Sequence, residues 1–144
     1  MYQKILLAYD GSGSGDAALH QAADLARLCN AELHVLSIVP TTGYASLAEG
    51  MSGVDVWGLE RESLQKALDA ACGDLRKQGV NAITCIREGD PAIEIIAHAI
   101  EIRSDLVVLG HTGKGFFGRW FEGSTGSELL RDLPCSLLIA AGKA

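Results

Sequence analysis

The amino-acid sequence predicts an α/β protein with a five-stranded, parallel, doubly wound sheet and helices on both faces. Three observations support this fold class. The length of 144 residues suits one domain, which we expect to span residues 1–144. Strand-like apolar runs alternate with segments in which apolar residues recur at helical spacing. The runs at 5–9 and 106–109 are apolar without interruption, as expected of parallel strands that are covered on both faces.

The first half of the chain predicts two strands and two helices. After the first strand, a Gly/Ser turn at 11–15 leads into a helix whose small apolar residues continue to about Cys29. Residues 33–39 form the second expected strand, and residues 40–56, with three glycines and no basic residue, predict a long loop. The second helix ends near Gly79 and is marked by four apolar positions. These are Leu64, Leu68, Cys72 and Leu75.

The second half predicts three more strands and two more helices. Residues 80–86 form the third expected strand. Asp90 suits the N-cap of a helix that has Pro91 at its first position. Apolar residues mark this helix at Ile93, Ile96, Ala97 and Ile100. The remaining expected elements are a strand at 106–109, a short helix after Ser124 that stops before Pro134, and a strand at 137–140.

Composition and charge exclude several classes of partner. The net charge of −6 argues against nonspecific nucleic-acid binding, which needs a basic surface. No apolar run approaches the roughly 18 residues of a membrane span, and no signal peptide is visible, so we expect a cytoplasmic protein. The cysteines form no C-x-x-C pair, which favours reduced structural thiols over a zinc or redox site. They are Cys29, Cys72, Cys85 and Cys135.

A glycine-rich segment follows the fourth predicted strand. Six glycines lie between positions 110 and 126, where the chain passes from a strand into a helix. Such a segment presents backbone N–H groups to an anion such as phosphate. The spacing Gly113-x-Gly115-x-x-Gly118 matches the glycine pattern of a dinucleotide-binding motif. However, aromatic residues separate it from the helix, and no acidic residue follows the next strand. We therefore reject an NAD site, and no Walker motif is present.

The spacing Gly110-x2-Gly113-x9-Gly123-Ser124 resembles the ATP-binding signature of the universal stress protein family. The stretches at 5–12, 89–91 and 133–138 extend this resemblance over nearly the whole chain. The family implies a five-stranded, Rossmann-like α/β fold, a role in stress response, and a homodimer formed through the last strand, here Ser136 to Ala140. The complete signature resembles the family's ATP-binding subclass, which implies ATP, with Mg²⁺, as the bound ligand.

The resemblance assigns Asp10 to the ribose, and a carboxylate can accept hydrogen bonds from both ribose hydroxyls. The alternative is an Asp-Gly turn residue. The other implied positions divide by the part of the nucleotide that they would contact. Ala8, Tyr9 and the backbone of Ile38 would lie beside the adenine, Gly110 beside the ribose, and Gly113, Gly123 and Ser124 around the phosphates, with His111, Lys114 and Thr125 as possible further donors.

Three hypotheses for function remain. The first is an ATP-binding regulatory protein with at most slow hydrolysis, since no catalytic set and no metal-ligand cluster is evident. The second is a homodimeric interaction module that binds no nucleotide and contacts a partner through an aromatic stretch. The alternative for this stretch is that it only anchors the loop on the domain. This stretch consists of Phe116, Phe117, Trp120 and Phe121. The third, a true hydrolase or transferase, would use His111 or Asp10. The other histidines, His20, His34 and His98, are expected to be structural or on the surface.

Overall fold

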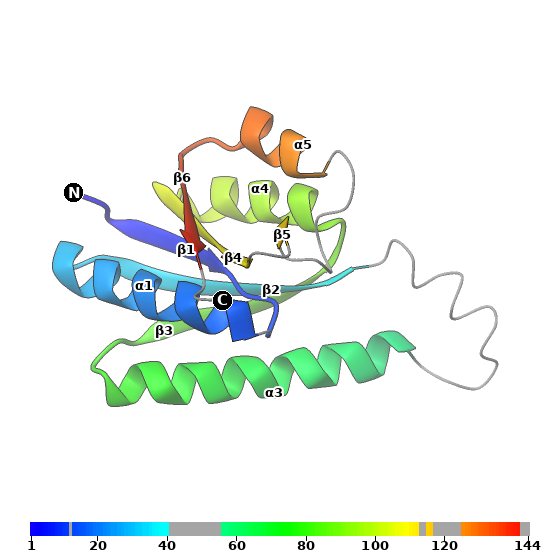
Figure 1. Cartoon of the computed structure of the whole chain (residues 1–144), viewed down its shortest axis with the longest axis horizontal. Coiled ribbons are helices and arrows are strands. Elements are labelled where there is room, and N and C mark those ends of the chain that lie inside the picture. Colours follow the sequence, from blue (N-terminus) through cyan, green and yellow to red (C-terminus); the bar gives the residue numbers. More distant parts are fainter. Residues whose placement is uncertain (12, 41–55, 113–114, 117–124, 142–144) are drawn as a thin grey trace.

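The computed structural model describes residues 1–11, 13–40, 56–112, 115–116 and 125–141 (Figure 1). Its helices and strands alternate along the chain. They are β1 (Lys4–Ala8), α1 (Gly13–Cys29), β2 (Glu32–Pro40), α3 (Val56–Lys77), β3 (Ala82–Gly89), α4 (Pro91–Ile102), β4 (Leu106–Thr112), β5 (Gly115–Phe116), α5 (Thr125–Asp132) and β6 (Ser136–Ala141).

Five parallel strands form the sheet in the order β3-β2-β1-β4-β6, and the short β5 pairs antiparallel with the end of β4. The predicted fold class is therefore confirmed. The chain begins in the centre of the sheet at β1, adds β2 and β3 on one side, and then continues with β4 and β6 on the other. The strand order reverses between β1 and β4, which is where doubly wound sheets bind ligands.

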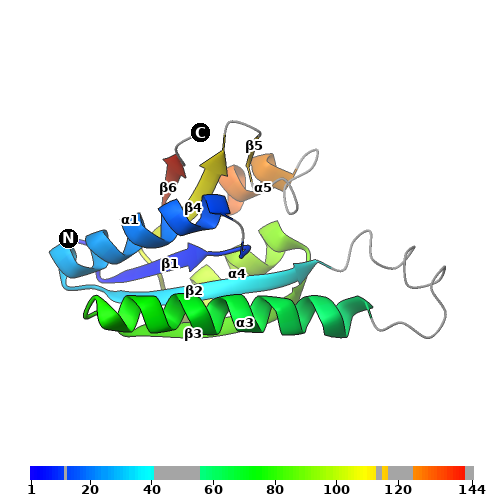
Figure 2. The same ribbon diagram turned by 60° about the horizontal axis from the view of Figure 1, so that its bottom comes forward.

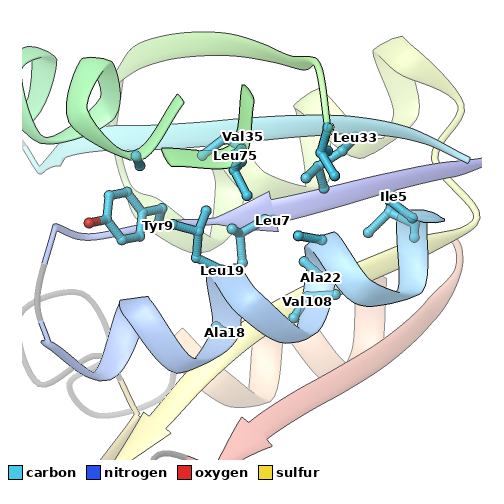
Figure 3. Packing of buried hydrophobic residues seen from close by; sticks show 14 of the residues in the cluster. Ile5, Leu7, Tyr9, Ala18, Leu19, Ala22, Leu33, Val35, Leu75 and Val108 are labelled. Atoms are coloured by element: carbon cyan, nitrogen blue, oxygen red, sulfur yellow. The ribbon is translucent and has the colours of Figure 1, made fainter. Parts of the chain in front are cut away.

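Helices cover both faces of the sheet. Figure 2 shows α1 and α3 over one face and α4 behind it over the other. Alternate residues of β1 supply both cores, because successive side chains of a strand point to opposite faces. Ile5 and Leu7 pack with the helices α1 and α3 (Figure 3), whereas Leu6 and Ala8 pack with α4 and α5. This double burial explains why residues 5–8 of the strand are all apolar.

The predicted start of α4 is confirmed. The Asp90 carboxylate accepts hydrogen bonds from the backbone N–H of Ala92, at 3.0 Å, and of Ile93, at 3.4 Å. Pro91 occupies the first turn, where its missing N–H is no loss. At the other end, Arg103 adopts a left-handed conformation with φ of 57°, and its N–H donates to the carbonyls of Ala99 and Ile100 in the last turn of the helix.

Several details differ from the predictions. The fourth strand, predicted at 106–109, continues to Thr112, because its last residues pair with β5 and β6. Helix α1 begins at Gly13, inside the stretch expected to be a turn. The third strand spans Ala82–Gly89 and not 80–86, because the Val80 N–H bonds to the Leu75 carbonyl and closes the end of α3. The short strand β5 was not predicted. Most of the loop predicted at 40–56 lies outside the described residues, and α3 starts at Val56.

The buried face of α4 also differs from the apolar residues that marked the helix in the sequence. Ile93 and Ile100 are each 58% exposed. The sheet instead covers residues on the neighbouring side of the helix, which are Ala92, Ile95, His98 and Ala99. The helix has apolar residues around most of its circumference, so sequence periodicity does not select one face.

Candidate functional site

The carboxyl ends of β1, β2 and β4 lie side by side at one edge of the sheet. Ala8, the last residue of β1, pairs with Leu36 of β2 and with Leu109 of β4. Ile38 lies two residues beyond Leu36, and Gly110 directly follows Leu109. This edge lies at the reversal of strand order, so the topology gathers residues from three distant parts of the sequence at the expected binding position.

Asp10 lies two residues beyond the end of β1 and is only 3% exposed. Gly11 follows it with φ of +80°, a left-handed conformation that favours glycine. A Cβ atom at Gly11 would also approach the Ala67 Cβ of α3 to 3.4 Å. The chain therefore turns sharply from β1 toward α1 at this point. Asp10 is both the turn residue and a buried carboxyl group at the edge. The two roles proposed from the sequence, a ribose contact and an Asp-Gly turn, are therefore compatible.

Ala8 and Ile38 lie together, but the side chain of Tyr9 does not join them. Ala8 and Ile38, both 0% exposed, belong to the core beneath α4 and α5. Tyr9 points to the opposite face, into the core with α1 and α3, as Figure 3 shows. Its hydroxyl lies 3.3 Å from a carboxylate oxygen of Asp16. Burial and this neighbouring carboxylate raise the pKa of Tyr9 to about 12. Tyr9 thus presents only its backbone on the Ala8 side.

Ser37 joins the ends of β1 and β2 and was missed in the sequence. Its side chain is 0% exposed, and its hydroxyl donates to the Tyr9 carbonyl at 2.6 Å. One signal was present, since Ser37 is the single polar residue in the apolar run at 35–39. A hydroxyl in such a position needs a hydrogen-bond partner, but the sequence does not reveal which one.

The end of β4 supplies the third part of the edge. Gly110 is buried and pairs with Ala140 of β6. The backbone of His111 pairs with Phe116 of β5 and with Ala141 of β6. The chain therefore turns back on itself directly after β4. The predicted phosphate contacts Gly113, Lys114, Gly123 and Ser124 lie outside the described residues, as do the side chains of His111 and Thr125. Thr125 is the first residue of α5.

The remaining histidines lie away from this edge. His20 is on the exposed surface of α1. His34 is 8% exposed, and its Nε2 lies 2.6 Å from Glu32. His98, on the buried face of α4, is 6% exposed, and its Nδ1 lies 3.2 Å from an Arg87 nitrogen. Burial, followed by the Arg87 charge, lowers the pKa of His98. Their positions agree with the structural or surface roles expected from the sequence.

The described residues contain neither a metal-binding cluster nor a membrane-spanning helix. No group of three or more His, Cys, Asp or Glu side chains in this part of the chain is placed to hold a metal ion. Among its helices, none combines the length and apolar character needed to cross a membrane. At the edge itself, the described residues supply a buried carboxyl group, strand-end backbone and a glycine, which suit a small polar ligand.

Comparison with known proteins identifies close relatives. Residues 1–141 match the universal stress protein family. A universal stress protein of Methanocaldococcus jannaschii is 30% identical over 139 residues, covering 96% of this chain and 82% of that protein. The universal stress protein YxiE of Bacillus subtilis is 32% identical over 147 residues, covering 96% of this chain and 99% of that protein.

Solved structures agree in fold. A universal stress protein family member from Burkholderia pseudomallei is 27% identical, with a TM-score of 0.73 and coverage of 96% of this chain and 95% of that one. A universal stress protein of Archaeoglobus fulgidus, solved in complex with dAMP, is 18% identical, with a TM-score of 0.69 and coverage of 96% and 97%. A further universal stress protein structure, solved in complex with cAMP, is 19% identical to this chain, with a TM-score of 0.62 and coverage of 96% of each chain. The family predicted from the sequence is confirmed, and this chain belongs to the universal stress protein family.

Proposed function

We propose that this chain binds an adenine nucleotide, with ATP as the main ligand, and acts as a nucleotide-dependent regulatory protein in a stress response. One observation carries the proposal. The structure brings Asp10, Ile38 and Gly110 to the carboxyl ends of three adjacent strands, at the reversal of strand order. Two universal stress proteins of the same fold, solved in complex with dAMP and with cAMP, support an adenine nucleotide as the ligand class.

Each part of the nucleotide has a proposed partner. The Asp10 carboxylate accepts hydrogen bonds from the ribose hydroxyls. Ala8 contributes little bulk, so the adenine can lie against the strand ends, with its edge on the Ile38 backbone. Gly110 has no Cβ and lets the ribose approach the end of β4. The phosphates then extend toward the glycine-rich segment and the start of α5, which begins at Thr125.

The phosphate contacts remain those proposed from the sequence, namely His111, Gly113, Lys114, Gly123, Ser124 and Thr125. Magnesium would arrive with the triphosphate, whose oxygens are ligands that this ion prefers. Its contribution there is to neutralise phosphate charge. We expect any ATP hydrolysis to be slow, because the sequence places no Ser/His/Asp set or carboxylate pair in this segment to activate a water molecule.

Dimerisation through β6 is the second part of the proposal. In the described part of the chain, β6 pairs with β4 along one edge and with no strand along the other. Its residues Leu137, Leu138 and Ile139 are only partly buried. A second copy of β6 would cover these side chains and pair the open edge. A cytoplasmic location also stays part of the proposal, and the four cysteines, all within described segments, are free thiols, as is usual in reducing compartments.

Thermal unfolding with and without nucleotide tests the binding proposal. Mg-ATP at about 100 times its Kd should stabilise the fold by about 2.7 kcal/mol and raise Tm by roughly 5–10 °C. Asp10→Asn keeps the side-chain shape but removes the charged acceptor, and should weaken binding about 10- to 100-fold. Asp132→Asn, an exposed carboxylate at the end of α5, is the matched control and should keep the full shift. Equal shifts in both variants would contradict the role of Asp10.

A bulky residue at Gly113 tests the phosphate segment separately. Gly113→Leu should abolish the ATP-induced shift without lowering the Tm of the protein alone, because a side chain would occupy the space of a phosphate. Circular dichroism of the unliganded variant checks the fold. Unchanged ATP affinity in Gly113→Leu would contradict the assignment of the segment and leave the Asp10 assignment standing.

A further inference from the structure

Ser37 is a polar side chain in an apolar part of the sheet. Its neighbours Leu36 and Ile38 are, like Ser37 itself, 0% exposed. The Ser37 hydroxyl donates to the Tyr9 carbonyl at 2.6 Å, immediately before Asp10. A serine here is less favourable for packing than valine or alanine. Its hydrogen bond with the backbone of the proposed site suggests a reason for its presence.

The pairing of β1 with β2 ends at this point. The last pair in register is Ala8 with Leu36, and the Tyr9 N–H donates to the Leu36 carbonyl at 2.8 Å. If the parallel ladder continued, the Tyr9 carbonyl would accept from the Ile38 N–H. That Ile38 bond is not formed between these two described residues, and the Ser37 hydroxyl donates to the Tyr9 carbonyl instead. The side chain therefore replaces the next backbone hydrogen bond between the two strands.

This replacement affects the backbone of Ile38. Successive peptide groups of an extended strand point to opposite edges, so the N–H and C=O of Ile38 point the same way as the Leu36 carbonyl, toward β1. Since β1 ends at Ala8, these two groups face the edge where the chain turns away at Asp10. A donor and an acceptor thus lie next to each other on one rigid strand.

We infer that Ser37 is a positioning residue that keeps the Ile38 backbone open for the edge of an adenine base. This inference rests on the proposed nucleotide binding and adds its base selectivity. Adenine offers an acceptor at N1 and a donor at its 6-amino group, which complement the Ile38 N–H and C=O. Hypoxanthine has a donor at N1 and an acceptor at O6, so it presents the reverse pattern. The geometry therefore selects ATP over ITP.

Replacing Ser37 changes this selectivity in a defined way. In Ser37→Ala the Tyr9 carbonyl loses its donor and takes the Ile38 N–H, which extends the ladder by one pair. ATP must then break that bond, so its affinity falls about fivefold to tenfold, the factor for one hydrogen bond. ITP does not use the Ile38 groups, so its affinity stays the same. The ratio of ATP affinity to ITP affinity therefore falls about fivefold to tenfold, by the same factor as the ATP affinity.

The test measures the Kd values of Mg-ATP and Mg-ITP by calorimetry on the full chain. Ser37→Cys keeps the side-chain shape with a weaker donor, and should lie between the unsubstituted chain and Ser37→Ala. It also serves if Ser37→Ala fails to fold, which thermal unfolding would show. Ser104→Ala removes another buried hydroxyl, 7% exposed, from the turn before β4, and should leave both Kd values unchanged.

The outcomes separate the two proposals. A loss of ATP affinity without a loss of ITP affinity supports the positioning role. Equal losses for both nucleotides, or no loss in Ser37→Ala and Ser37→Cys, would overturn it and leave nucleotide binding in place. Failure of the unsubstituted chain to bind ATP would overturn the proposed function and this inference together.

Discussion

Two isoleucines on α4 allow a strict test of how this helix packs. Ile95 is 0% exposed in the core beneath α4 and α5, whereas Ile93, two residues earlier on the same helix, is 58% exposed. Both Ile95→Ala and Ile93→Ala remove the same atoms from the same secondary structure. Differences in helix propensity therefore cancel between the two variants, and the remaining difference in stability reports burial.

The expected magnitudes follow from the buried fraction of each side chain. Ile95→Ala removes three buried carbon atoms, worth about 2.4 kcal/mol in transfer free energy, and leaves a cavity. We expect a loss of about 3–4 kcal/mol in the free energy of unfolding and roughly 10 °C in Tm. Ile93→Ala loses about 1 kcal/mol of partial burial and regains about 0.4 kcal/mol of helix propensity, for a net loss of about 0.5 kcal/mol.

Urea unfolding followed by circular dichroism measures both values at one protein concentration, so that any effect of self-association is shared. The midpoint should fall for Ile95→Ala with little change in the slope of the transition. Equal losses in the two variants, or a larger loss for Ile93→Ala, would refute the assignment of the buried face of α4.

Two further predictions concern pH and assembly. Because the pKa of His98 is lowered in the folded state, the unfolded chain binds the proton more readily, so the free energy of unfolding should fall as pH drops below about 6.5. The charged and titratable groups around His98 are Arg87 from β3, Glu94 and Glu101 from its own helix, and His34 from β2. Urea titrations at a series of pH values measure how the free energy of unfolding depends on pH, and the part of this dependence that disappears in His98→Gln is the contribution of His98. For assembly, Leu138→Asp should convert a dimer to a monomer in analytical ultracentrifugation, because it places a charge on the proposed β6 interface. A monomeric unsubstituted chain, or a dimeric Leu138→Asp variant, would contradict the β6 interface.

Much of the fold could be predicted because the relevant signals are local. The apolar run at 5–9 is buried on both faces, and the Asp90-Pro91 pair starts a helix with its own hydrogen bonds. The face of α4 could not be chosen, because isoleucine and alanine surround most of the helix and only the sheet decides which side is covered. Boundaries also shifted where tertiary hydrogen bonds decide them, as at Val80.

Part of the candidate site could also be proposed from the sequence. The resemblance indicated Asp10, Ile38 and Gly110, and the strand register places them at one edge. Tyr9 was expected beside the adenine. Its side chain points to the α1 and α3 face with Ile5 and Leu7, a direction that strand alternation already implies, so that expectation can concern only its backbone. Ser37 could not be identified, because its partner is a backbone carbonyl 28 residues away in the chain.

A calorimetric titration of the full chain with Mg-ATP tests the central proposal most directly. The proposal predicts saturable heat with one nucleotide per chain, a weaker response to Mg-GTP, and a loss of at least tenfold in affinity for Asp10→Asn, the lower end expected for a hydrogen bond to a charged group. Absence of binding heat at millimolar Mg-ATP, together with no thermal shift, would contradict it.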